Sequence, residues 1–203
     1  WSSGKFPEFT EPSKGYHGLV YSEALGEAAY IAKIRLEGLR DFGGALSPFN
    51  AFQIIQGLET LSVRIKKHSK SALKLAQWLE KQEEVSWVNY PGLKSAPYHE
   101  LAKKYLPKGQ SGLVTFGLKG GYEAAQKVVD SVKYFSLLAN IGDTKSLIIH
   151  PTSTTHQQLS EEDQLKTGVS QDLIRLSVGL EDLKDLKADL KEAFKKVQSL
   201  VEK

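Results

Sequence analysis

The sequence predicts an α/β protein in which a long helix leads into a small two-layer domain, with helices on one face of a sheet. Helical periodicity fills much of residues 22–82, and the helix predicted from Ser47 to about Gln82 is long enough to connect two domains. Short β-rich segments alternate with helical patterns after residue 84, and the chain closes with a strongly amphipathic helix. The β-rich segments are 85–88, 112–118, 147–149 and 173–178.

The first part of the chain predicts a loop and then a helix. Residues 1–20 contain Pro and Gly among aromatic and polar residues without a period, which is typical of an extended loop. From Ser22, apolar residues recur at helical spacing as far as Gly43, where a glycine pair ends the pattern.

A second helix is predicted to begin at Ser47, which caps it, with Pro48 in the first turn. Its apolar faces are expected to turn inward as far as about Gln82, with a bend at Gly57 or within 66–71. The set of residues expected to face inward is Phe52, Ile55, Leu58, Thr60, Leu61, Ile65, Leu73, Leu75, Ala76 and Leu79.

The predicted strands are separated by helical patterns at 98–106, 122–134 and 160–167. In the last helix a single apolar stripe faces away from a Lys/Glu surface, so that helix is expected to pack on the sheet. The stripe consists of Leu183, Leu186, Leu190, Phe194 and Val197.

Composition excludes several classes of function. The 27 basic and 24 acidic residues are interleaved, so no nucleic-acid partner is expected. No cysteine is present, which rules out disulfides, thiolate metal sites and a cysteine nucleophile. No apolar run reaches the length of a membrane span and no leader is evident, so we expect a cytoplasmic protein. Because the chain begins at Trp1 and contains no methionine, we expect it to be a piece of a longer protein.

Arg175 is the strongest candidate for a binding residue. Alternation along the segment 173–178 places Ile174, Leu176 and Val178 on one face and Arg175 and Ser177 on the other. If the first face packs on helices, Arg175 points into an open cleft, where a guanidinium can grip a carboxylate through two hydrogen bonds. A solvent-facing strand arginine is the alternative, and the pattern alone does not choose between them.

The segment 140–156 joins a glycine turn, a buried strand and a loop rich in hydroxyls. Such loops often hold binding residues, yet their hydroxyls more often make turn and capping hydrogen bonds, and Asp143 and Thr144 are expected to do so. His150 and His156 have no acidic residue at a ligand spacing, so no metal site is predicted. The residues by themselves supply a carboxylate clamp without a nucleophile, a metal or a phosphate site.

Three motifs carry a resemblance to a known family. They are LSPFNAFQIIQGLETLSVRIKKHS at 46–69, GDTKSLIIHPTSTTH at 142–156 and LIRLSVGLE at 173–181. Their order and spacing resemble the Cys/Met-metabolism family of pyridoxal-phosphate enzymes, and the opening GKFPEFTEPSKGYHGLVYSEALGEAAYI looks like its O-acetylhomoserine sulfhydrylase branch.

The resemblance implies the C-terminal portion of a fold-type-I enzyme. Its small domain would have a mainly antiparallel sheet. Residues 1–70 would end the large cofactor domain and form the linking helix, and 71–203 would form the small domain. The cofactor would be pyridoxal 5'-phosphate, and the lysine and other groups that bind it would lie upstream of Trp1. Lys145 does not match the family's lysine motif.

The resemblance also assigns residues and partners. Arg175 matches the arginine that binds the substrate carboxylate. Asn140 replaces a serine that contacts the same group in many relatives, and Thr155 matches a threonine of that pocket, while Ser153 and His156 would shape the loop. The implied activity is γ-replacement, making homocysteine from O-acetylhomoserine and sulfide for methionine biosynthesis. The partners would be the amino-acid substrate, the missing N-terminal portion and the other chains of a homotetramer.

Three alternatives stay open at this point. The chain could belong to a cystathionine γ-synthase or a methionine γ-lyase of the same family, whose motifs are nearly shared. It could also be a non-catalytic fragment, because the cofactor lysine is missing.

Overall fold

The computed structural model describes residues 1–201, and the chain separates into two compact units, Trp1–Gly57 and the residues from Leu58 onward. The division at residue 70 that the resemblance implies concerns the complete enzyme and stays a prediction.

In the first unit, the helix predicted from Ser22 is broken near its start, and helical backbone then continues from Ala29 to Asp41. The chain breaks at Gly26, whose φ of 53° lies in the left-handed region that an α-helix cannot contain. Two short helices also lie within 1–20, where a loop was predicted. Proline favours the first turn of a helix, and Pro7 begins the first of these two. The elements are α1 (Pro7–Thr10), η1 (Lys14–Tyr16), α2 (Tyr21–Leu25), η2 (Gly26–Ala28), α3 (Ala29–Lys33) and the π-helix η3 (Ile34–Asp41).

A small core holds these turns together. Phe9, Tyr21 and Ala29 are buried, and the Tyr21 hydroxyl donates to Glu37 at 3.0 Å. Burial raises the pKa of Tyr21 to about 12, so its hydroxyl stays protonated as a donor. Lys33 donates to the same carboxylate at 2.7 Å and lowers the pKa of Glu37. This polar triplet therefore joins α2 to η3.

Helices α4 (Pro48–Glu59) and α5 (Leu61–Leu79) replace the single predicted helix. The cap at Ser47 is confirmed, because its hydroxyl accepts the N–H of Asn50 at 3.1 Å. The interruption falls at Thr60, and not at Gly57 or within 66–71 as predicted.

The inward-turning face is confirmed only for the C-terminal half of the pattern. Leu75, Ala76 and Leu79 of α5 are fully buried. The expectation was wrong for α4, in which no residue is buried; Phe52 is 57% exposed and Ile55 54% exposed. Leu58 and Ile65 are exposed as well. An apolar helix that is left uncovered presents a surface suited to a packing partner.

The second unit is built on a five-stranded sheet in the order β1-β2-β5-β4-β3. The neighbouring pairs β1–β2, β2–β5 and β5–β4 are antiparallel, and only β3 pairs in parallel, with β4. The mainly antiparallel sheet is thereby confirmed. The strands are β1 (Val85–Asn89), β2 (Leu113–Leu118), β3 (Ser136–Leu137), β4 (Leu147–Ile149) and β5 (Leu173–Ser177).

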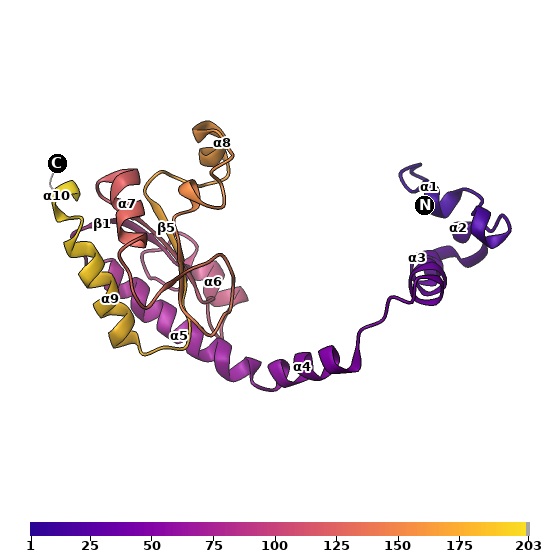
Figure 1. Cartoon of the computed structure of the whole chain (residues 1–203), viewed down its shortest axis with the longest axis horizontal. Helices are drawn as coiled ribbons and strands as arrows, with labels where there is room; N and C mark the ends of the chain where they lie inside the picture. The colour runs from indigo at the N-terminus through magenta and orange to yellow at the C-terminus, as the bar shows by residue number, and fades with distance from the viewer. Residues whose placement is uncertain (202–203) are drawn as a thin grey trace. The chain divides into compact units, whose positions relative to one another are not determined.

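Helices α5, α7 and α9 cover one face of this sheet (Figure 1). The apolar stripe predicted for the last helix is confirmed, because Leu186, Leu190 and Phe194 of α9 are buried in the core. Phe194 also stacks on Trp78 of α5 with ring centroids 6.0 Å apart. The remaining elements are α6 (His99–Tyr105), α7 (Gly121–Val129), η4 (Pro151–Ser153), α8 (Glu161–Lys166), α9 (Leu183–Lys195) and α10 (Gln198–Val201). The predicted two-layer α/β arrangement with helices on one face is confirmed.

Within residues 1–201, no helix has both the length and the apolar character that crossing a membrane requires.

Candidate functional site

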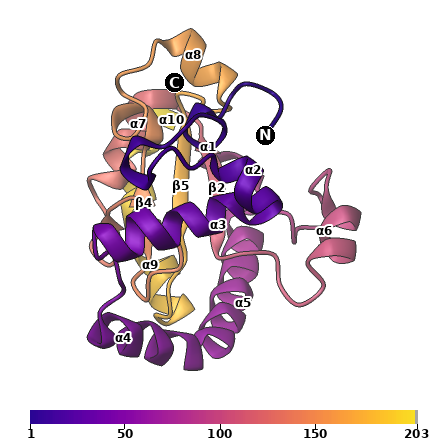
Figure 2. The same ribbon diagram turned by 90° about the vertical axis from the view of Figure 1, so that its right-hand side faces the viewer.

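The site residues are positioned by β5, a strand with two chemically different faces. Ile174 and Leu176 are fully buried in the core beneath the helices. Arg175 points to the opposite face and is half-buried. In Figure 2, β5 lies between β2 and β4, so this arginine emerges from the middle of the sheet. The predicted separation of the two faces is confirmed.

A cavity of about 280 Å³ lies beside Arg175 on this face. Thr115 of β2 is the register partner of Arg175 and lines the cavity too. The polar side chains in its wall come from β1, the segment before β2, and the strands β2 and β5. The full lining is Asn89, Pro91, Leu106, Gln110, Ser111, Leu113, Thr115 and Arg175. The half-buried position at a cavity favours the cleft interpretation of Arg175 over a freely solvated strand arginine.

Arg175 has little protein bonding of its own. Its Nη2 donates to the backbone carbonyl of Asn140 at 3.4 Å. No ion pair within residues 1–201 involves this guanidinium. A half-buried cation without a carboxylate partner is suited to an anionic ligand, because partial desolvation strengthens the attraction.

Asn140 lies in the exposed loop between β3 and β4. Its side-chain oxygen accepts the N–H of Ile141 at 2.9 Å, so the side chain is engaged with its own backbone. The structure thus brings Asn140 to Arg175 through the main chain. A direct role for the Asn140 side chain at a substrate stays a prediction.

Thr155 is exposed and lies in the loop after η4. Its hydroxyl is 2.8 Å from Nδ1 of His156. Among residues 1–201, no hydrogen bond joins Thr155 to Arg175 or Asn140, and Thr155 is not in the wall of the cavity. Its predicted place in the substrate pocket therefore stays untested.

The rest of this hydroxyl loop is held by the buried His150. Its Nδ1 is 2.9 Å from the Ser153 hydroxyl and its Nε2 is 2.9 Å from the Gln171 carbonyl. The Nε2–H therefore donates to the carbonyl, while Nδ1 can accept from Ser153. Burial lowers the pKa of His150, which keeps the ring neutral for this arrangement.

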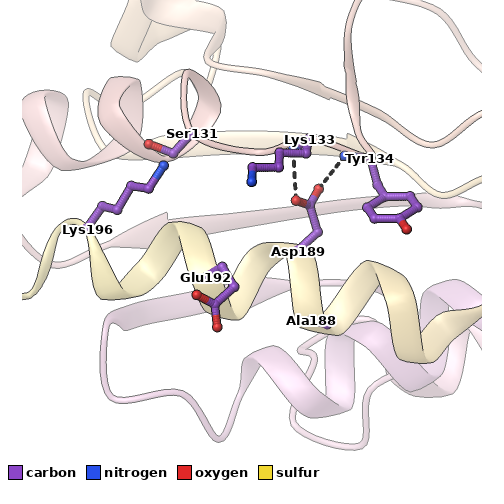
Figure 3. A pocket seen from close by; sticks show the side chains of 7 residues that line it. All are labelled: Ser131, Lys133, Tyr134, Ala188, Asp189, Glu192 and Lys196. Atoms are coloured by element: carbon purple, nitrogen blue, oxygen red, sulfur yellow. Dashed lines mark hydrogen bonds between the residues drawn. The ribbon is translucent and has the colours of Figure 1, made fainter.

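A second pocket, of about 240 Å³, lies between α9 and the segment before β3 (Figure 3). Asp189, which is buried, accepts the backbone N–H groups of Lys133 and Tyr134 at 2.8 Å each and that of Phe135 at 3.3 Å. These bonds occupy the carboxylate, so its work is to hold the chain at 133–135.

Sequence reasoning missed two groups of residues at the site. Thr115 enters the cavity wall through the pairing of β2 with β5, which no local pattern signals, and Gln110 and Ser111 follow from the segment before β2. Glu181 was inside the motif 173–181, but its bonds to Ser146 could not be inferred from spacing along the chain. No cluster of residues suited to binding a metal ion occurs in residues 1–201.

Comparisons with known proteins show the family of this chain. The sequence model of the family described as Cys/Met metabolism PLP-dependent enzyme matches residues 13–195. The chain is 56% identical over 195 residues to O-acetyl-L-homoserine sulfhydrylase 1 of Thermus thermophilus, covering 96% of this chain and 46% of that protein. It is 49% identical to homocysteine synthase of Schizosaccharomyces pombe, covering 95% of this chain and 45% of that protein.

A solved structure from Campylobacter jejuni gives the same result for the fold. Its description names an O-acetylhomoserine (thiol)-lyase with N'-pyridoxyl-lysine-5'-monophosphate. The TM-score is 0.80 at 48% identity, over 93% of this chain and 45% of that one. The chain thus spans about half the length of the relatives it matches. Since the family model matches residues 13–195 of 203, this chain belongs to the pyridoxal-phosphate-dependent enzymes of cysteine and methionine metabolism.

Proposed function

We propose that this chain is the C-terminal part of an enzyme that makes homocysteine from O-acetylhomoserine and sulfide. The observation that carries the proposal is the half-buried guanidinium of Arg175, which lines a cavity and forms no ion pair within residues 1–201. The relatives named as O-acetylhomoserine sulfhydrylases and homocysteine synthases support the same reaction. It would contribute to methionine biosynthesis in the cytoplasm.

The proposed work of Arg175 is to bind the substrate's α-carboxylate. The planar guanidinium can form two parallel hydrogen bonds to a carboxylate, which fixes both position and orientation. With its carboxylate fixed, the amino acid presents its Cα–H bond in one direction, and that orientation lowers the barrier to proton removal. Asn140 and Thr155 are proposed to complete the pocket around the same group.

The cavity beside Arg175 does not by itself fit the family's cofactor. The cavity beside Arg175 has no lysine, aromatic ring or carboxylate in its wall, and these are the groups that would hold and tune such a ring. The residues that bind pyridoxal phosphate are therefore proposed to lie in the N-terminal portion of the same enzyme. The electron-withdrawing chemistry of the cofactor would be supplied there.

The exposed helix α4 supports the proposal of a missing portion. Phe49, Phe52, Ile55 and Leu58 are each more than half exposed, although such side chains are usually buried. We propose that the N-terminal portion covers this helix in the complete enzyme, and that the enzyme assembles as a homotetramer. Separately expressed portions should then bind each other, and Phe52→Glu with Ile55→Glu should prevent that binding, whereas Lys119→Glu on the exposed turn after β2 should not.

The proposed reaction is tested by product analysis of the complete enzyme. O-acetylhomoserine and sulfide should give homocysteine and acetate. Thioether formation from cysteine, with no reaction of sulfide, would instead indicate a cystathionine γ-synthase, and methanethiol release from methionine would indicate a methionine γ-lyase. Either result would overturn the proposal, as would homocysteine formation by the 203-residue chain alone, because the cofactor lysine is placed outside it.

A further inference from the structure

The loop that carries Asn140 has almost no apolar packing to hold it beside Arg175. Leu138 is 53% exposed and Ile141 66% exposed, so the loop's large apolar side chains are not anchored in the core. Its position must therefore depend on hydrogen bonds at its ends. The first of these closes the base of the loop, where the N–H of Ser136 donates to the Ser146 carbonyl at 3.0 Å.

Glu181 provides the strongest of the other bonds. One of its carboxylate oxygens accepts the backbone N–H of Ser146 at 2.7 Å, and the other accepts the Ser146 hydroxyl at 2.7 Å. Ser146 is fully buried, and hydrogen bonds to a charged acceptor are stronger than neutral ones. The Glu181 side chain thus accepts from both hydrogen-bond donors of Ser146, its backbone N–H and its hydroxyl.

The same serine ties the loop to the end of β5. Its hydroxyl oxygen accepts the backbone N–H of Gly179 at 2.8 Å, and the N–H of Leu180 donates to the Thr144 carbonyl at 2.9 Å. Gly179 permits this approach, because a Cβ there would lie 2.4 Å from the Thr144 carbonyl oxygen. Arg175 lies four residues before Gly179 in the same segment.

We infer that Glu181 is a positioning residue for the substrate carboxylate. Through Ser146 and Gly179 it holds the loop of Asn140 against the strand of Arg175, and so maintains the contact between the Asn140 carbonyl and Nη2 of Arg175. The inference rests on the proposed carboxylate-binding role of Arg175. Glu181 does not touch the substrate; it acts through the loop.

The test compares four variants of the complete enzyme. Glu181→Ala removes both acceptors, Ser146→Ala removes only the hydroxyl, and Glu181→Gln keeps one acceptor oxygen. Asp182→Ala is the matched control, because Asp182 is the neighbouring carboxylate and its side chain accepts the N–H of Lys184, at the start of α9. It weakens the helix end without touching the loop.

Glu181→Ala and Ser146→Ala should raise the KM for O-acetylhomoserine about tenfold, with a much smaller change in the KM for sulfide. Glu181→Gln should recover part of this loss. Amide hydrogen exchange across 138–146 should become faster in the first two variants, and Asp182→Ala should leave both the KM and this exchange as in the unmodified enzyme.

An unchanged KM in Ser146→Ala, with faster exchange of the loop, would overturn the inference, since the loop would then be free without consequence for the substrate. Unchanged exchange would overturn it as well. If Glu181→Ala does not fold, the result for Ser146→Ala tests the inference by itself. This variant keeps the bond from the backbone N–H of residue 146 to Glu181, so it is expected to fold. Failure of the proposed function is a separate result: the unmodified enzyme would make no homocysteine, and the variants would be compared on whichever amino acid it does use.

Discussion

Nη2 of Arg175 donates to the main-chain carbonyl of Asn140 at 3.4 Å, which joins the middle of β5 to the exposed loop before β4. The bond is long, so it holds the guanidinium in place without satisfying it.

Replacing Arg175 by alanine in the complete enzyme should raise the KM for O-acetylhomoserine strongly, with the cofactor still bound. Removing one partner of a desolvated charge pair typically costs roughly 2–5 kcal/mol. Steady-state kinetics measure the effect, and the cofactor's absorbance checks that it is retained. Arg175→Lys keeps the charge but loses the planar pair of donors, so its KM should lie between those of the unmodified enzyme and of Arg175→Ala. An unchanged KM would refute the assignment.

Gly179→Ala should destabilise the chain by about 1–3 kcal/mol, because overpacking against atoms that cannot move is costly. The new Cβ would lie 2.4 Å from the Thr144 carbonyl oxygen and 2.5 Å from the Lys145 carbonyl carbon, both in the main chain. Urea denaturation measures the loss. Gly57→Ala in α4 is the control: a Cβ there meets nothing within 4 Å, and a small gain of roughly 0.5–1 kcal/mol is expected. Equal midpoints for the two variants would contradict this account.

Asp189→Asn should also lower the free energy of unfolding. The carboxylate accepts three backbone N–H groups, at Lys133, Tyr134 and Phe135, whereas an amide has one oxygen and would turn a donor toward one of them. Leaving a buried N–H without an acceptor costs about 1–3 kcal/mol. Thermal unfolding should detect it. Glu192→Gln, on the exposed side of the same helix, should unfold like the original chain; a similar loss in both would show that charge, and not the bonding, is responsible.

Stability should fall as the pH drops below the ordinary histidine value of 6.5, in part because of His150. Burial lowers the pKa of this ring in the folded chain. The unfolded chain therefore binds the proton more readily, and acid stabilises the unfolded state relative to the folded one. The contribution of His150 is fully present above that pH and is lost progressively toward the lower pKa of the folded state. Urea midpoints from about pH 8 to about pH 5 should decline less steeply in His150→Gln. Parallel declines in the two proteins would exclude His150 as the cause.

Local pattern was sufficient where the physical cause is itself local. The alternation at 173–178 predicted the faces of β5, the period of the last helix predicted its buried stripe, and Ser47 predicted a cap. The helix predicted from Ser22 was confirmed only in part, from Ala29 to Asp41. Its apolar spacing is helical, but the backbone conformation of Gly26 interrupts it. The two-residue strand β3 was missed because two residues carry no detectable period.

The sequence by itself determined the family, through three motifs in a characteristic order, and it singled out Arg175 as the candidate for binding a carboxylate. Only the tertiary structure decided what surrounds that arginine. The pairing of β2 with β5 places Thr115 opposite Arg175, and the bonds of Ser146 to Glu181 and Gly179 hold the loop of Asn140 nearby. These contacts join residues 33 to 60 positions apart, and so they follow from the order in which the strands pair and not from any periodicity along the chain.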